Sequence, residues 1–176
     1  RLSRSDFRPI QIHGLPETLD ALQRHLFNNV IWPDFTRLPT RERPILELVP
    51  FAIGDRLELA GLTIEVLPAH HTVPACGFAV DTPSGWWVYT GDTGPNPALW
   101  ERLRGRPIAQ LVIETAFSDE ERALAEVSRH LSPSMLAEEL TRMDLDCDTS
   151  VPITHVKPGE MAAVTGQLDE IGRAHV

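Results

Sequence analysis

The stretch Trp86–Gly94, written WWVYTGDTG, combines the two signals that decide the fold. Residues 86–90 are aromatic or β-branched, which is typical of a β-strand. Gly91–Gly94 ends that strand in a turn, because glycine and aspartate favour turn conformations. Asp92 therefore stands just beyond the end of a strand, where α/β proteins commonly bind ligands.

Outward from this stretch, the first half of the chain predicts mainly strands and the second half predicts alternating strands and helices. This order predicts an α/β sandwich with helices outside the sheets. Ser118 and Glu121 have the spacing of a helix capping box. The expected strands are residues 8–12, 45–49, 57–60, 62–68, 77–81, 86–90, 108–114 and 151–154, and the expected helices are 16–28, 97–104, 118–129, 132–143 and one from 160.

Composition is that of an ordinary globular domain, with 176 residues, 42% hydrophobic and 23% charged. The formal net charge of -9 disfavours a nucleic-acid binder, which usually carries a basic face. Two distant cysteines, Cys76 and Cys147, form no disulfide framework, and we expect a reducing, cytoplasmic location. No apolar run reaches the roughly 18–20 residues of a membrane span.

Three polar residues follow predicted strands, namely His71, Asp92 and His155. Two imidazoles and a carboxylate are ligand types of a hydrolytic zinc or manganese site. The alternatives are a hydrogen-bonded histidine at each strand end and a simple turn at Asp92. His70 precedes His71 directly, and adjacent side chains on a strand point to opposite faces, so we expect only His71 to face this site.

Five short motifs make the chain resemble the second half of the metallo-β-lactamase superfamily. Among its branches, the chain is most similar to the class II cyclic-nucleotide phosphodiesterases, which neighbour the tRNA 3′-processing endonucleases. The resemblance covers nearly all of residues 8–168 and implies the C-terminal two-thirds of an αββα sandwich. The motifs are HTVPACGF (71–78), VYTGDTG (88–94), IETAF (113–117), RHLSP (129–133) and ITHVKP (153–158), with GLPETL (14–19) and HLFNNVIWPDF (25–35) in support.

The resemblance also implies roles for individual residues. It assigns His71, Asp92 and His155 as ligands of two divalent metal ions, with zinc expected first and manganese or iron as alternatives. It assigns His130 as a catalytic histidine that donates a proton to the leaving oxygen or stabilises the phosphorane-like transition state, with a surface histidine at a helix end as the alternative. Glu114 is expected to orient His130 or a ligand imidazole, with a purely structural acid as the alternative.

One signature of the superfamily, H-x-H-x-D-H, is missing from the chain, because His13 and His25 lack its spacing. We expect a fragment cut after this motif, and the alternative is a degenerate domain that has lost it. Residues 1–170 are expected to form a single partial domain, and this chain alone is expected to be weakly metallated and inactive. Residues 171–176 resemble a translated sequencing adapter and are expected to be non-native.

The resemblance implies a phosphodiesterase that hydrolyses 3′,5′-cyclic nucleotides such as cAMP to nucleoside 5′-monophosphates. The expected partner is this small substrate, without membrane or nucleic acid, and a homodimer is left open. A tRNA 3′-processing-type ribonuclease is the alternative, which residues 72–91 disfavour because they hold one predicted hairpin and no RNA-gripping arm. A non-catalytic binding module, with Trp32–Phe35 and Trp86–Trp87 as a partner surface, is the alternative from another class.

Overall fold

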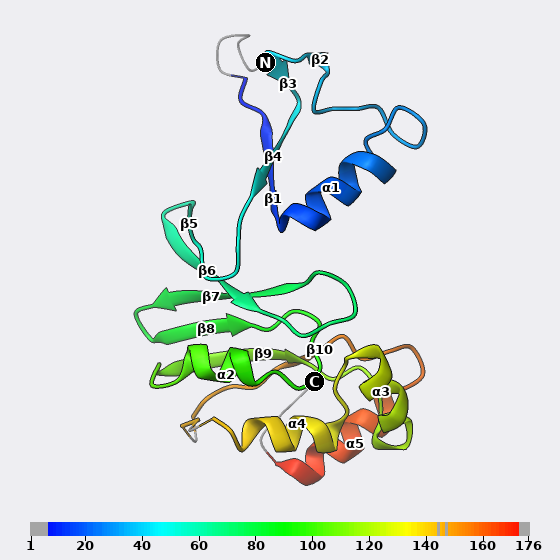
Figure 1. The fold of residues 1–176 in the computed structure, drawn as a ribbon. Coiled ribbons are helices and arrows are strands. Elements are labelled where there is room, and N and C mark those ends of the chain that lie inside the picture. Colours follow the sequence, from blue (N-terminus) through cyan, green and yellow to red (C-terminus); the bar gives the residue numbers. More distant parts are fainter. Residues whose placement is uncertain (1–6, 144, 147, 173–176) are drawn as a thin grey trace. The chain divides into compact units, whose positions relative to one another are not determined.

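A computed structural model of the chain describes residues 7–143, 145–146 and 148–172 (Figure 1). It divides into two compact units, residues 1–52 and residues 53–176. Each unit is described separately below, and the expectation of one partial domain over residues 1–170 stays a prediction. Within the described residues, no helix has the length and apolar character needed to cross a membrane.

In the first unit, a parallel strand pair carries one helix. Strand β1 (Ile10–Gly14) pairs with β4 (Leu46–Pro50) in parallel, and helix α1 (Pro16–His25) follows β1 directly. The helix begins with Pro16 in its first turn, where a missing N–H costs no helical hydrogen bond. The short strands β2 (Pro39–Thr40) and β3 (Arg43–Pro44) complete this unit.

The second unit is built on a six-stranded sheet with the order β10-β9-β8-β7-β6-β5 (Figure 1). Strands β5 to β8 form an antiparallel meander, whereas β8, β9 and β10 run parallel to one another. The strands are β5 (Arg56–Leu59), β6 (Leu62–Pro68), β7 (Cys76–Thr82), β8 (Gly85–Tyr89), β9 (Ile108–Glu114) and β10 (Ile153–Thr154).

Helices of the second half pack on the sheet through one hydrophobic core. Leu67, Val88 and Leu111 of the sheet belong to the same buried cluster as Leu99 of α2 and Leu136 of α4. The helices are α2 (Pro97–Leu103), η1 (Asp119–Glu121), α3 (Arg122–Ser128), α4 (Pro133–Leu140) and α5 (Met161–Ile171). The α/β class expected from the sequence is therefore confirmed.

The helix expected over residues 118–129 differs in the structure. It begins as the 3₁₀ turn η1 and becomes α-helical only at Arg122. The expected capping box is wrong, because the Ser118 side chain makes no capping hydrogen bond. Instead, the carboxylate of Glu160 accepts the Ser118 N–H at 2.9 Å, so a residue from a distant segment satisfies this end.

The end of the chain falls partly outside the described residues. Helix α5 runs to Ile171, and Gly172 follows it in a left-handed conformation that is typical of helix ends. Residues 173–176 and Cys147 lie outside the described residues. The non-native origin of residues 171–176 stays a prediction.

Candidate functional site

Strand direction brings four of the expected site residues to one edge of the sheet. Because β8, β9 and β10 are parallel, Glu114 at the end of β9 and the residues Asp92 and His155 beyond β8 and β10 gather at one edge. Strand β6 runs in the same direction as β8, since each is antiparallel to β7 between them. The loop after β6 therefore carries His71 to the same edge.

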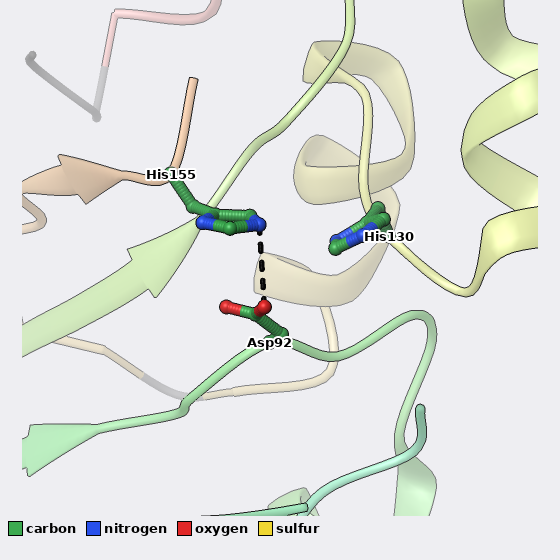
Figure 2. A group of neighbouring side chains, drawn as sticks. All are labelled: Asp92, His130 and His155. Carbon is green, nitrogen blue, oxygen red and sulfur yellow. Dashed lines mark ion pairs between the residues drawn. The ribbon is translucent and has the colours of Figure 1, made fainter. Parts of the chain in front are cut away.

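At this edge, Asp92, His130 and His155 form a close group (Figure 2). One donor atom from each of the three side chains lies within 4.8 Å of the others. The Nε2 atom of His155 is 3.2 Å from Oδ2 of Asp92, and the His155 ring centroid is 5.1 Å from that of His130. Since these residues come from three separate segments, tertiary structure assembles the group.

His71 lies beside this group on the His130 side. Its ring centroid is 4.8 Å from the centroid of His130, and its Nδ1 hydrogen-bonds the Arg129 carbonyl at 3.1 Å. The tightest group thus pairs Asp92 and His155 with His130, whereas the sequence led us to group them with His71. The ligand set His71, Asp92 and His155 stays a prediction.

His70 behaves differently from its neighbour. Its Nδ1 lies 3.0 Å from the Pro95 carbonyl, and its backbone N–H donates to Thr93 Oγ1 at 2.9 Å. In turn, the Gly94 N–H donates to the His70 carbonyl at 2.9 Å. His70 therefore ties its own loop to the loop that carries Asp92.

Glu114 is fully buried and holds His130 by a hydrogen bond of 2.6 Å between Oε1 and Nδ1. The backbone N–H groups of Thr93 and Leu131 also donate to this carboxyl group. This arrangement leaves Nε2 of His130 as the ring nitrogen available to the group. One buried acid thereby joins the Asp92 loop, strand β9 and the His130 segment.

Glu114 and His130 lie close enough for an ion pair, but their shifted pKa values favour the uncharged form of both side chains. Burial raises the pKa of Glu114 to about 8, even though two backbone N–H groups favour its charged form. Burial lowers the pKa of His130 to about 4, and the positive charge of Lys157 lowers it further. Near neutral pH the pair therefore shares one hydrogen bond without separated charges.

Lys157 is a site residue that sequence reasoning missed. Its Nζ lies 2.8 Å from Nε2 of His155 and 6.0 Å from the ring centroid of Phe117. It is the only lysine in the sequence, since the other basic residues are arginines. A single lysine placed two positions after the candidate ligand His155 was the sequence signal that could have identified Lys157.

His155 itself has an unusual backbone conformation, with φ at 68°. Residues other than glycine adopt this left-handed region at an energetic cost, and such residues concentrate at functional sites. The turn aims its imidazole back at Asp92, as Figure 2 shows.

The donor set fits a divalent metal ion. Imidazole nitrogen and carboxylate oxygen suit zinc, manganese and iron, and three such donors already converge here. His130 is held through Nδ1 by a carboxyl group, which is the usual outer-sphere partner of a metal-binding imidazole. The donor types of the group therefore suit a metal, although the Lys157 Nζ, 2.8 Å from His155 Nε2, would have to give up that contact for His155 to bind one.

A family model described as "Beta-lactamase superfamily domain" matches residues 3–172, which is nearly the whole chain. The chain belongs to this superfamily. Its metallo-β-lactamase fold is confirmed by the solved structure of unliganded yeast PDE1, which matches 98% of the chain and 58% of its own length. The TM-score is 0.76 at 20% sequence identity.

Two further relatives place the chain within the superfamily. A probable 3′,5′-cyclic-nucleotide phosphodiesterase of Yersinia pestis is 26% identical over 173 residues, which are 84% of this chain and 49% of that protein. Human tRNase Z, short form, has a TM-score of 0.54 at 16% identity, over 87% of this chain and 62% of its own. The chain thus spans about half the length of the curated relative.

Proposed function

We propose that the protein is a metal-dependent phosphodiesterase that hydrolyses 3′,5′-cyclic nucleotides to nucleoside 5′-monophosphates. The observation that carries the proposal is the convergence of Asp92, His130 and His155 at one sheet edge. The relatives support it, because a probable cyclic-nucleotide phosphodiesterase and a cAMP/cGMP phosphodiesterase of Dictyostelium discoideum are each 26% identical to this chain.

In this proposal, His71, Asp92 and His155 hold two divalent ions, with zinc expected first. When bound, such ions supply Lewis acidity, which activates water and neutralises phosphoryl oxygens. Asp92 is suited to face both ions, since a carboxylate offers two oxygens. The donor atoms of Asp92 and His155 already lie 3.2 Å apart.

His130 protonates the leaving group. Water attacks phosphorus, the bond from phosphorus to O3′ breaks, and O3′ takes the proton from Nε2 of His130 while Nδ1 takes the carboxyl proton of Glu114. The attacking water keeps one proton on the phosphate and releases the other to solvent, from which Glu114 is protonated again. Glu114 keeps the ring in place through Nδ1, so that Nε2 faces the group. The product keeps its phosphate on O5′ and has a free 3′ hydroxyl group.

A ribonuclease of the tRNA 3′-processing type is the second candidate, favoured by the likeness to human tRNase Z. Two observations weigh against it. Between His71 and Asp92 the chain forms only the hairpin of β7 and β8, which offers no arm to grip RNA. The net charge of -9 also opposes binding to a polyanion.

The test uses the longest natural open reading frame that contains this chain. The purified protein is analysed for metal content, and its hydrolysis of 3′,5′-cAMP, 3′,5′-cGMP and a precursor tRNA is measured, with products identified by chromatography. We expect 5′-AMP from cAMP, and roughly 100-fold or greater losses of kcat/KM in His71→Ala and Asp92→Ala.

The matched control is His70→Ala, since His70 neighbours His71 but points into the Pro95 loop. It should retain turnover within a factor of about three. Unchanged turnover in both ligand variants would remove this site from the mechanism. Cleavage of tRNA without cAMP hydrolysis would favour the ribonuclease, and neither activity in a metallated protein would favour a binding module.

A further inference from the structure

Arg129, the residue before His130, adopts a left-handed backbone conformation with φ 56° and ψ 54°. It ends helix α3 at a position where glycine is common, because glycine carries no Cβ to clash. An arginine there raises the energy of the folded backbone. A compensating contact is therefore expected at this residue.

That contact is a reciprocal pair of hydrogen bonds with His71, 58 positions earlier in the sequence. The Arg129 carbonyl faces Nδ1 of His71 at 3.1 Å, and the Arg129 guanidinium donates to the His71 carbonyl at 2.8 Å. A carbonyl only accepts hydrogen bonds, so Nδ1 of His71 carries the proton. The lone pair of the neutral ring then lies on Nε2, the form that binds a metal ion.

The backbone of Arg129 also packs closely against the loop that carries Asp92. A Cβ built on Gly94 would lie 3.3 Å from both the carbonyl carbon and the Cα of Arg129. Gly94 in turn donates its N–H to the His70 carbonyl at 2.9 Å. Arg129 therefore stands where the segments of His71, Asp92 and His130 meet.

We propose that Arg129 is a positioning residue that fixes the tautomer and orientation of His71 and so keeps Nε2 ready for a divalent cation. The inference rests on the proposed function in one respect, that His71 is a metal ligand. Glycine would relieve the backbone at this position but would lose the guanidinium hydrogen bond. Arginine at position 129 therefore keeps the hydrogen bond that holds His71 in place, at the cost of a less favourable backbone conformation.

The test compares Arg129→Gly and Arg129→Lys with a matched control, Ala60→Gly. Ala60 also has a left-handed backbone, with φ 51°, but lies in the turn between β5 and β6. Three quantities are measured on the purified protein of the longest natural open reading frame that contains this chain: the thermal midpoint, the His71 ring tautomer by ¹⁵N NMR, and the affinity for Zn²⁺ added alone.

Arg129→Gly keeps the carbonyl that faces His71 Nδ1 but loses the guanidinium hydrogen bond that holds the His71 backbone beside it. We therefore expect an equal or higher thermal midpoint, a mixed rather than uniform Nδ1–H signal of His71, and a Zn²⁺ affinity about 10-fold weaker. Arg129→Lys, which keeps a cationic donor, should restore part of the affinity. Ala60→Gly should raise the midpoint and leave both His71 and Zn²⁺ binding unchanged. In Arg129→Gly the thermal midpoint should stay equal or rise while the Zn²⁺ affinity falls. That combination distinguishes a positioning role of Arg129 from a general structural role.

The proposal is overturned if Arg129→Gly keeps the His71 tautomer and binds Zn²⁺ as the unsubstituted chain does. It is equally overturned if Zn²⁺ affinity falls only in parallel with a lower thermal midpoint. Failure of the unsubstituted protein of the longest natural open reading frame to bind Zn²⁺ would instead count against His71 as a ligand, and the tautomer measurement would still decide whether Arg129 holds the ring.

Discussion

Glu114 Oε1 lies 2.6 Å from His130 Nδ1, and the same carboxyl group accepts the backbone N–H of Thr93, one residue after Asp92. A single buried side chain therefore sets the position of the candidate proton donor and of the loop that holds the candidate metal ligand. Its removal should affect catalysis more than overall stability.

Glu114→Gln should lower kcat by about 10-fold to 100-fold with little change in KM, because the amide replaces the carboxyl partner of His130 without emptying the space. Steady-state cAMP hydrolysis by the protein of the longest natural open reading frame measures this change. Glu65→Gln is a matched control, since Glu65 is equally buried but belongs to an arginine network on β6. An equal loss of kcat in the two variants would show that Glu114 acts only through stability.

Glu65→Gln itself should destabilise the fold by roughly 1–3 kcal/mol, because it removes a buried carboxylate that accepts charged hydrogen bonds from two partly exposed arginines. The Glu65 carboxylate accepts from Arg102 Nε at 2.6 Å and from Arg106 NH1 at 2.9 Å. Urea unfolding measures the loss. Glu58 is exposed on β5, and Glu58→Gln should change the free energy of unfolding by less than about 0.5 kcal/mol. Similar losses in the Glu58 and Glu65 variants would show that the contacts of Glu65 with its arginines do not stabilise the fold.

Acid should weaken the hydrogen bonds that the Asp119 carboxylate accepts from Ser132 and Ser134. Burial alone would raise its pKa, but hydrogen bonds from Ser132 and Ser134 outweigh burial and lower the pKa below the ordinary value. The folded-state pKa is therefore below the unfolded value of about 3.9, so the stabilisation is present above that pH and disappears as pH falls through the folded pKa.

Asp119→Asn should accordingly reduce stability near pH 7 by about 1–2 kcal/mol and flatten its decline in acid. Urea midpoints between pH 7 and pH 2.5 measure the effect. Asp169→Asn, on the exposed face of α5, is the control and should follow the unsubstituted chain. A parallel acid decline in Asp119→Asn and the unsubstituted chain would exclude Asp119 as its source.

Gly77→Ala should destabilise the sheet next to the site by about 2 kcal/mol or more, because its Cβ would meet backbone atoms that cannot move aside. The Cβ would lie 2.5 Å from the Tyr89 carbonyl oxygen and 2.7 Å from that of Thr90. Thermal unfolding measures the loss.

Gly166→Ala is the opposite case on helix α5. Nothing lies within 4 Å of its Cβ position, so the substitution should stabilise the helix by about 0.5–1 kcal/mol. If both glycine substitutions changed stability in the same direction, the close backbone approach at Gly77 would not be the cause.

Local sequence patterns predicted much of the fold correctly. Alternation and turn residues located β6, β7, β8 and β9, and the apolar spacing located α1 and α2. The expected capping box at Ser118 was wrong because capping is decided by which acid reaches the N–H, and Glu160 reaches it from 42 positions away. Such a partner leaves no mark in the local pattern.

The sequence by itself placed the candidate ligands His71, Asp92 and His155 after predicted strands, and the family resemblance added His130 and Glu114 as candidates. The sequence could place these ligands because strand endings and turns follow from nearby residues. Tertiary structure alone decided that His130 joins Asp92 and His155, that Lys157 faces His155, and that Arg129 holds His71. The physical reason is that parallel pairing of β8, β9 and β10, and the hydrogen bonds across their ends, join residues far apart in the chain.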